Sequence, residues 1–187
     1  MTQRSASRSP AVFLDRDGTL MRDVDYCGHP NDVHVFPCAS ESLLRMKAAG
    51  YRVIVITNQS GIGRGYFNEQ QYLMVQQEVT RQVGQGLIDA TYYCPHRPNE
   101  NCSCRKPAPE MVHRAAEEQR VDLTRSFFVG DKQSDLECGR SAGVKTILVR
   151  TGYGEQTDTR LADIVVNDLT EVADVIVRWT AGAAPEK

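Results

Sequence analysis

The nine residues VFLDRDGTL, residues 12–20, contain the feature from which both the fold and the chemistry can be argued. The first three predict a short buried strand, because β-branched and aromatic residues favour extended structure. Asp15 and Asp17 come directly after this strand, and Gly18 follows as in a tight turn. The segment therefore predicts a strand that delivers two carboxylates to one place.

Outward from this segment, short β-branched runs alternate with longer helical patterns. We expect strands at 12–14, 51–57, 90–94, 126–130, 145–149 and 164–166, and helices at 41–49, 68–84, from 109, 134–142 and from 168. The run YRVIVIT at 51–57 is almost continuously apolar, which is typical of a strand buried on both faces. Because such alternation requires crossover connections, we expect an α/β fold: a doubly wound, mainly parallel Rossmann-like sheet with helices on both faces.

The length of 187 residues is about that of one domain. We expect a single domain over residues 11–180, between a disordered N-terminal tail at 1–10 and a loose C-terminal tail at 181–187. The predicted helices and strands use most of the residues between them, so no room remains for a separate cap domain. We therefore expect a capless molecule with an open site, whose specificity is carried by loops.

The charge balance of the chain indicates which classes of partner it can bind. The chain has 22 basic and 24 acidic side chains and no basic stripe, which argues against a nucleic-acid partner. No apolar run approaches the roughly 18 residues that cross a bilayer, so we expect no membrane contact. The first ten residues lack the apolar core of a secretory signal, and the six cysteines are interpreted as reduced thiols of a cytoplasmic protein. We expect a monomer.

Polar side chains follow several of the predicted strands. Thr57 and Asn58 end the second strand, Asp131 follows the fourth, and Arg105 and Lys106 precede the helix that leads into it. The carboxyl ends of parallel strands meet at one edge of a sheet, where ligands of such folds bind. We therefore expect carboxylates, a hydroxyl and a lysine to converge on one rim.

This set of side chains suits phosphoryl transfer. Three carboxylates in a small volume, Asp15, Asp17 and Asp131, require a hard divalent cation, and Mg²⁺ is the expected ligand. Lys106 and the Thr57 hydroxyl would neutralise a phosphate monoester sufficiently for an anionic nucleophile to approach phosphorus. We expect Asp15 to attack and form an aspartyl phosphate, with Asp17 as the general acid and base.

Four ordered segments resemble the motifs of the haloacid dehalogenase-like phosphatases: LDRDGT at 14–19, ITNQS at 56–60, CRKP at 104–107 and GDKQSD at 130–135. The resemblance spans about residues 12–149. It implies Asp15 as the nucleophile, Asp17 as the acid and base, and Asp131 as the third magnesium carboxylate. It also implies that Asp135 lies outside the ligand set and helps to orient the loop.

Three cysteines and one histidine fall within eleven residues: Cys94, His96, Cys102 and Cys104. Three thiolates and an imidazole form a closed tetrahedral set, which is the pattern of structural zinc. We therefore expect a zinc loop at 94–104. Because this loop runs directly into Arg105 and Lys106, the zinc would position the lysine that binds phosphate.

The zinc loop on a capless chain is similar to the branch of the family that acts on heptose bisphosphates and histidinol phosphate, as are residues 58–67 and 92–96. The resemblance implies a phosphorylated sugar as substrate, with hydrolysis of the 7-phosphate of D-glycero-D-manno-heptose 1,7-bisphosphate, a precursor of lipopolysaccharide or other glycans. A bisphosphate also needs a second site for an anion. The residues expected to bind the sugar or its phosphates are Asp23, Asp25, Tyr26, Thr57, Asn58, Gln59, Ser60, Arg64, Arg105, Lys106 and Lys132.

Two alternatives remain at this point. A histidinol-phosphate phosphatase would share the motifs and the zinc loop, although Arg64 disfavours it. A zinc-binding interaction module without enzymatic activity would explain the cysteines. That second alternative leaves Asp15, Asp17, Lys106 and Asp131 without a role.

Overall fold

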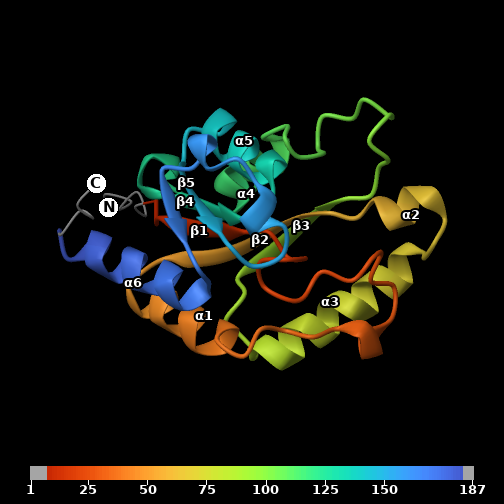
Figure 1. The fold of residues 1–187 in the computed structure, drawn as a ribbon, viewed down its shortest axis with the longest axis horizontal. Helices are drawn as coiled ribbons and strands as arrows, with labels where there is room; N and C mark the ends of the chain where they lie inside the picture. Colours follow the sequence, from red (N-terminus) through yellow and green to blue (C-terminus); the bar gives the residue numbers. More distant parts are fainter. Residues whose placement is uncertain (1–7, 183–187) are drawn as a thin grey trace, which may run out of the picture.

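The computed structural model describes residues 8–182, which alternate between strands and helices along the chain (Figure 1). The strands are β1 (Ala11–Leu14), β2 (Arg52–Asn58), β3 (Ala90–Cys94), β4 (Phe127–Gly130), β5 (Lys145–Val149) and β6 (Ile164–Val166). The α-helices are α1 (Ala39–Ala48), α2 (Ser60–Arg64), α3 (Glu69–Val83), α4 (Glu110–Glu118), α5 (Gln133–Ser141) and α6 (Leu169–Thr180). Short 3₁₀ turns lie in the connections.

The six strands form one sheet in the order β3-β2-β1-β4-β5-β6. Every neighbouring pair is parallel. From the centre, the chain adds strands in one direction as far as β3 and then reverses at β1 to add β4, β5 and β6. The doubly wound prediction is confirmed. Its geometry places the reversal, where ligands of such sheets bind, between β1 and β4.

Alternate residues of the strands pack into two hydrophobic layers. Val12 and Leu14 of β1 face the layer under α1, α3 and α6, whereas Phe13 faces the layer under α4 and α5. Figure 1 shows these two groups of helices on opposite sides of the sheet. All four residues of β1 are fully buried, so the first strand ends at a fixed point in the core.

Most helix predictions are confirmed to within two residues. Helix α3 begins with a reciprocal capping box between Asn68 and Gln71 and buries the predicted stripe at positions 72, 75, 79 and 83. Helix α2 was not expected, because Gly61 and Gly63 disfavour helix. A Cβ atom at Gly61 would lie 2.2 Å from the ring of Phe67, so this short helix needs glycine for close packing.

The connections after β1 and β2 contribute to the main body of the protein. Val33 in the first connection and Val75 and Val79 of α3 belong to the same hydrophobic cluster as the sheet. Within residues 8–182 these segments therefore add to the existing core and build no second one. The loop between β3 and α4 projects from the sheet edge (Figure 1, green).

The expected tails fall mostly outside the described residues, which exclude 1–7 and 183–187. Ser9, which belongs to the expected N-terminal tail, is described. It exchanges backbone hydrogen bonds with Arg120 and Asp122. Near the start of the described structure, Ser9 is therefore hydrogen-bonded to the segment that follows α4.

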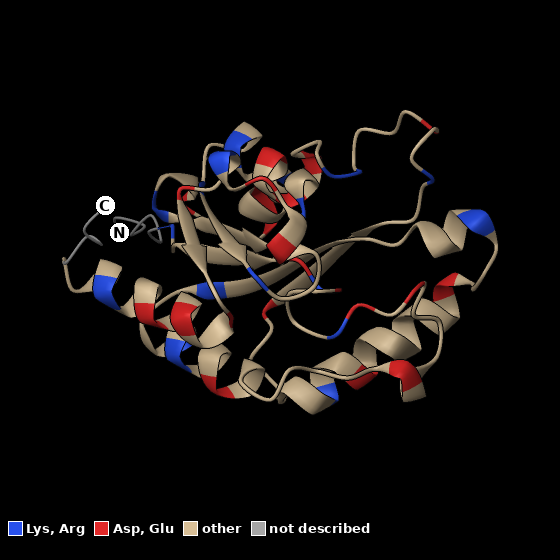
Figure 2. Cartoon of the chain, viewed as in Figure 1, with Lys and Arg blue, Asp and Glu red and all other residues tan. Residues whose placement is uncertain are grey.

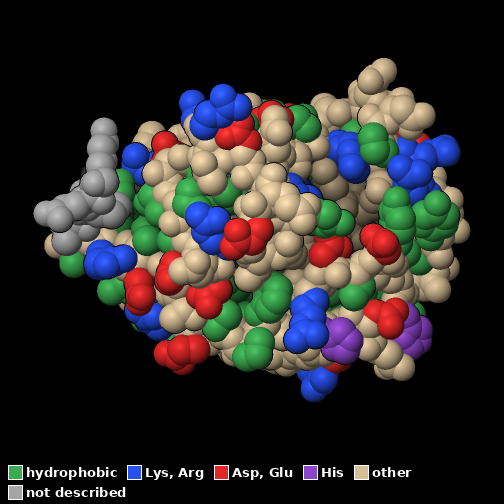
Figure 3. All heavy atoms as spheres, in the orientation of Figure 1, with side chains coloured by type: hydrophobic (Ala, Val, Ile, Leu, Met, Phe, Trp, Pro, Cys, Tyr) green, Lys and Arg blue, Asp and Glu red, His purple; other side chains and the backbone are tan. Residues whose placement is uncertain are grey.

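Charged side chains of both signs are distributed along the helices and loops (Figure 2). On the face shown in Figure 3, acidic and basic groups of the described residues are interspersed. Among residues 8–182, no helix has the length and apolar character needed to cross a bilayer.

Candidate active site

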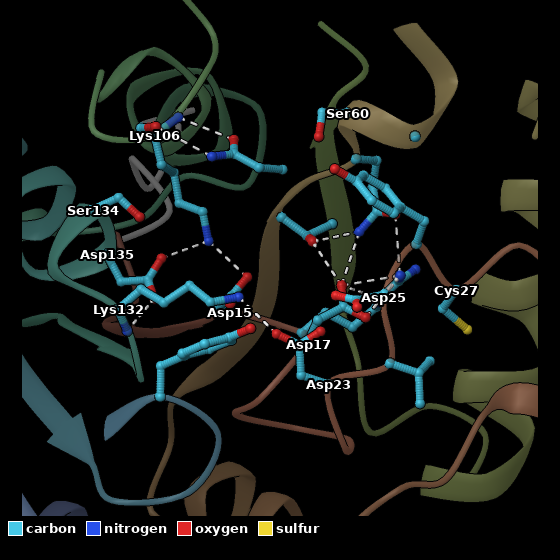
Figure 4. Close-up of a pocket in the computed structure, with 18 of the residues that line it drawn as sticks. Asp15, Asp17, Asp23, Asp25, Cys27, Ser60, Lys106, Lys132, Ser134 and Asp135 are labelled. Atoms are coloured by element: carbon cyan, nitrogen blue, oxygen red, sulfur yellow. Dashed lines mark hydrogen bonds and ion pairs between the residues drawn. The ribbon is translucent and has the colours of Figure 1, made fainter. Parts of the chain in front are cut away.

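The expected nucleophile, Asp15, lies at the carboxyl end of β1 and is only 4% exposed. Its Oδ1 atom accepts a hydrogen bond of 2.6 Å from Lys106 Nζ. The same ammonium donates to the carbonyl of Ile56 at 2.8 Å and pairs with Asp135 Oδ1 at 2.7 Å. Figure 4 shows Lys106 between the two carboxylates. Three acceptors therefore fix the position of this lysine and, through it, of Asp15.

Burial and neighbouring charges shift the pKa values of this cluster. Burial raises the pKa of Asp15 to about 7, against the opposing effect of Lys106. Burial and the neighbouring Asp135 raise the pKa of Asp131 to about 6. Burial disfavours the charge of Lys106, but Asp135 and Asp15 outweigh it and raise its pKa above the ordinary value. A bound cation would stabilise the charged form of these two carboxylates.

Oxygen atoms of Asp15, Asp131 and Asp135 lie within 4.8 Å of one another. Asp135 uses both of its oxygens inside the protein, because Oδ1 pairs with Lys106 and Oδ2 accepts the backbone N–H of Lys132 at 3.0 Å. Asp15 bonds Lys106 through Oδ1, and Asp131 accepts the Tyr153 N–H through Oδ2 and a long contact of 3.4 Å from the Thr19 hydroxyl through Oδ1. Of the three carboxylates, Asp15 and Asp131 are therefore the less tightly bound within the protein and the better placed to hold a metal. Their oxygen donors and their raised pKa values fit a hard divalent cation.

The loop that follows β5 fixes Asp131. The backbone N–H of Tyr153 donates to Asp131 Oδ2 at 2.8 Å, and the Thr157 hydroxyl donates to the Asp131 carbonyl at 2.8 Å. A Cβ atom at either Gly18 or Gly152 would approach Asp131 Oδ2 to 2.2 Å, so both positions require glycine. Sequence reasoning missed this loop, since its residues carry no motif of their own.

Asp17 is held by a different set of groups. Its carboxylate accepts hydrogen bonds from Arg16 Nε at 3.0 Å, Arg16 Nη2 at 3.1 Å and Gln59 Nε2 at 2.9 Å. The Thr57 hydroxyl lies 3.5 Å from Asp17 Oδ2. The Asp17 side chain is therefore held apart from the carboxylates that lie within 4.8 Å of one another, which are those of Asp15, Asp131 and Asp135.

Asn58 acts on the backbone of the lysine loop. Its Oδ1 atom accepts the N–H of Lys106 at 3.1 Å, and its Nδ2 atom donates to the Lys106 carbonyl at 3.2 Å. The side chain of Asn58 thus ties the end of β2 to the loop before α4. This places it as a support of Lys106.

These groups surround one polar pocket of about 270 Å³ (Figure 4). The expected site residues that line it are Asp15, Asp17, Asp23, Asp25, Tyr26, Thr57, Asn58, Gln59, Ser60, Arg105, Lys106, Lys132 and Asp135. Arg16, Ser134 and Tyr153 also line it and were not expected. Ser134 stands inside the fourth motif, which was the available signal, whereas Tyr153 had none.

One side of the pocket is formed by an ion pair, because Lys132 Nζ lies 2.9 Å from Asp23 Oδ2 and 4.8 Å from the centre of the Tyr153 ring. Arg64 and Asp131 are not among the lining residues. The guanidinium of Arg64 lies 5.8 Å from the centre of the ring of Tyr26, which does line the pocket.

The cysteine loop forms a compact group beside the pocket. Cys94 Sγ lies 3.6 Å from Cys102 Sγ, 3.1 Å from Cys104 Sγ and 3.6 Å from His96 Nδ1. Ligands in tetrahedral contact with zinc at about 2.3 Å stand roughly 3.7 Å apart, so these spacings fit such an ion. All four side chains belong to one candidate metal group, and the cysteines are free thiols.

The fold and this site define a hydrolase of the haloacid dehalogenase-like class. In agreement, the family model described as HAD-hydrolase-like matches residues 103–172. A D-glycero-β-D-manno-heptose-1,7-bisphosphate 7-phosphatase of Photorhabdus laumondii is 37% identical over 178 residues, covering 89% of this chain and 95% of that relative. One from Helicobacter pylori is 42% identical over 145 residues, covering 75% and 83%.

A solved structure agrees with these relatives. The D,D-heptose 1,7-bisphosphate phosphatase of B. bronchiseptica, complexed with magnesium and phosphate, superposes with a TM-score of 0.84 at 32% identity, covering 91% of this chain and 99% of that one. The chain belongs to the D-glycero-D-manno-heptose-1,7-bisphosphate 7-phosphatase family of haloacid dehalogenase-like hydrolases. It is a phosphatase, so the alternative of a non-enzymatic zinc module is wrong.

Proposed function

We propose that this phosphatase removes the 7-phosphate of D-glycero-D-manno-heptose 1,7-bisphosphate through an aspartyl-phosphate intermediate. The observation that supports the chemistry is the buried Asp15–Lys106 pair beside a polar pocket. The near full-length similarity to relatives of that name supports the substrate.

In the first step, an oxygen of Asp15 attacks the phosphorus of the 7-phosphate, and the bond from phosphorus to the sugar oxygen breaks. Asp17 gives its proton to the departing oxygen. In the second step, water attacks the phosphorus while Asp17 takes the proton, which releases phosphate and restores the Asp15 carboxylate. Lys106 holds Asp15 in position throughout.

The proposed cation is Mg²⁺, held by Asp15 and Asp131, and when bound it would neutralise charge on the phosphoryl oxygens. The relative solved with magnesium supports this choice. A contribution of Asp17 to the metal stays a prediction from the sequence. Asp135 is proposed as a positioning residue, since it holds Lys106 and the N–H of Lys132.

The substrate is tested by released phosphate across a panel of esters. Turnover of the heptose bisphosphate should far exceed that of histidinol phosphate, glucose 6-phosphate and glycerol 3-phosphate, and a chelator should abolish it. Faster turnover of histidinol phosphate would replace the proposed substrate with the alternative one.

The second phosphate of the substrate is proposed to bind at Arg105, with Arg64 and Lys132 nearby. Replacing Arg105 with Ala should raise the KM for the heptose bisphosphate about 10-fold, because one charge-assisted contact is lost. The KM for heptose 7-phosphate, which lacks the second phosphate, should stay within about 2-fold. Steady-state kinetics on both esters measure the difference.

Arg97 provides a matched control for this experiment. It is an exposed arginine of the same loop, paired with Glu100 at 2.8 Å, and it lines no part of the pocket. Arg97→Ala should leave both KM values unchanged. Equal losses on the two esters in Arg105→Ala would show that Arg105 does not bind the second phosphate.

We also propose that Cys94, His96, Cys102 and Cys104 hold a structural zinc ion that positions Arg105 and Lys106. Arg105 Nη1 donates to the carbonyl of His96 at 3.2 Å, so it is tied to this loop directly. Cys104 precedes Lys106 by two residues.

Replacing Cys102 with Ser is therefore expected to lower zinc content and kcat/KM together. The zinc is measured by plasma mass spectrometry and the activity on the same preparation. Cys38→Ser is the control, because Cys38 is a free thiol outside this group. Full turnover by a zinc-free Cys102→Ser protein would contradict the coupling.

For the molecule as a whole, we propose one domain over residues 11–180 and a monomeric, cytoplasmic enzyme. The expected catalytic residues line one pocket of the chain, so a second copy is not needed to complete the site. Free cysteines suit a reducing compartment.

A further inference from the structure

The residue between the two motif aspartates is fully buried. Arg16 is 0% exposed, although arginine is among the residues least often found inside proteins without partners. A buried guanidinium needs acceptors. Among the described residues, Nε and Nη2 of Arg16 are bonded, chiefly to Asp17, whereas Nη1 has no hydrogen-bond partner. This arrangement gives Arg16 a part in the site that neither the motif nor the expected phosphate contacts assign.

The contacts of Arg16 with Asp17 are bidentate. Nε donates to Asp17 Oδ2 at 3.0 Å and Nη2 donates to Oδ1 at 3.1 Å. Two parallel bonds from a planar group fix both the position and the rotation of the carboxylate plane, which a single bond would leave free.

Arg16 is itself immobilised from several directions. Nη2 also donates to Gln59 Oε1 at 3.1 Å, and Gln59 in turn donates to Asp17 and to Thr57. The guanidinium lies 5.6 Å from the centre of the Tyr72 ring, in a cation–π contact. Its backbone carbonyl accepts the N–H groups of Leu20 and Met21. Gln59, directly after β2, and Tyr72 of α3 therefore hold the Arg16 side chain, while the turn after β1 fixes its backbone.

From this geometry we infer that Arg16 is the positioning residue of the proton-transfer step, because it holds the Asp17 carboxylate toward the pocket at the orientation needed to protonate the departing oxygen. The inference rests on the proposed function, in which Asp17 is the general acid. In this proposal Arg16 acts through Asp17.

The test compares two leaving groups. A sugar alkoxide needs a proton as it departs, whereas 2,4-dinitrophenolate leaves without one. In Arg16→Met, kcat/KM for the sugar ester should fall about 100-fold, the range of a lost general acid, and that for 2,4-dinitrophenyl phosphate less than about 5-fold. Because kcat/KM reports the steps up to departure of the leaving group, later hydrolysis does not enter the comparison.

Partial unfolding of a variant does not change the ratio that this test measures. Both esters are assayed on one preparation, so the ratio of the two kcat/KM values is independent of the folded fraction. Lys106→Met is the contrasting variant. It should lower both values alike, because Lys106 holds the nucleophile and not the acid. Arg16→Lys, which keeps the charge but cannot form both bonds, should show a smaller change in the ratio in the same direction.

A double-mutant cycle identifies the path of the effect. If Arg16 works through Asp17, adding Arg16→Met to Asp17→Asn should cost less than about 3-fold further on the sugar ester. Equal losses on both leaving groups in Arg16→Met, or full additivity in the double variant, would overturn the inference. If the wild type prefers another alkyl phosphate to the heptose bisphosphate, the proposed substrate fails while the same comparison, run on that ester, still decides the role of Arg16.

Discussion

Replacing Asp15 with Asn is expected to lower kcat/KM at least about 10⁴-fold, which would be the largest loss of any single substitution in the site. The amide is a poor nucleophile and cannot form the acyl phosphate. The substitution also removes the negative charge that faces Lys106 Nζ, which lies 2.6 Å from Asp15 Oδ1. Steady-state phosphate release from the proposed substrate measures the loss.

Trapping the intermediate separates the covalent role of Asp15 from a merely structural one. When water attacks the phosphorus of the aspartyl phosphate, the bond from phosphorus to Asp15 breaks, the oxygen from water leaves with the phosphate, and the Asp15 carboxylate keeps its own two oxygens. The probe is therefore acid quenching during turnover, followed by mass spectrometry of the peptide that contains Asp15. A phosphate adduct is expected on Asp15 in the wild type. Wild-type turnover by Asp15→Asn would contradict the covalent mechanism.

Replacing Lys106 with Met is expected to lower kcat/KM about 10³-fold, comparable to the upper range for loss of one preorganised cationic donor. Without the ammonium, Asp15 and Asp135 face each other unneutralised, and the carbonyl of Ile56 loses its donor. The thermal midpoint should be measured on the same variant, because leaving buried acceptors unpaired also destabilises the fold.

Lys132 supplies the comparison for Lys106. It is a partly exposed lysine of the same pocket, and its ammonium pairs with Asp23 Oδ2 at 2.9 Å. Lys132→Met should cost less than Lys106→Met in both activity and thermal midpoint. A smaller loss in Lys106→Met than in Lys132→Met would contradict the role given to the buried lysine.

Features set by local pattern were predictable from the sequence. The stripe of α3 and its capping box depend on spacings of three and four residues, and both are confirmed. The parallel, doubly wound sheet follows from the alternation of strands and helices and from the handedness of their crossovers, whereas its strand order was not predicted. The convergence of Asp15 and Lys106, 91 residues apart, was predictable because Asp15 directly follows β1 and Lys106 lies in the connection that leaves the same edge of the sheet after β3.

Features set by tertiary packing were not predictable. Nothing in the string LDRDGT indicates that the Arg16 side chain is buried and hydrogen-bonded to Asp17. The conformation of this side chain depends on Gln59 and the Tyr72 ring, which belong to other elements. Helix α2 forms although its glycines disfavour helical structure. Gly61 is required there because the ring of Phe67 occupies the space that a side chain would fill. The support of Asp131 by the loop after β5 is likewise a long-range contact.

The cysteine group has a consequence for engineering the molecule. Cys94 ends β3, and Cys104 stands just before the lysine loop that Asn58 anchors. The segment between His96 and Cys102 is thus a loop, and the residues at its two ends lie in the same candidate metal group. We therefore expect its ends to stay in place when its length is changed. A peptide epitope or a fluorophore tag grafted there would be displayed on the outside, with the chemistry left intact.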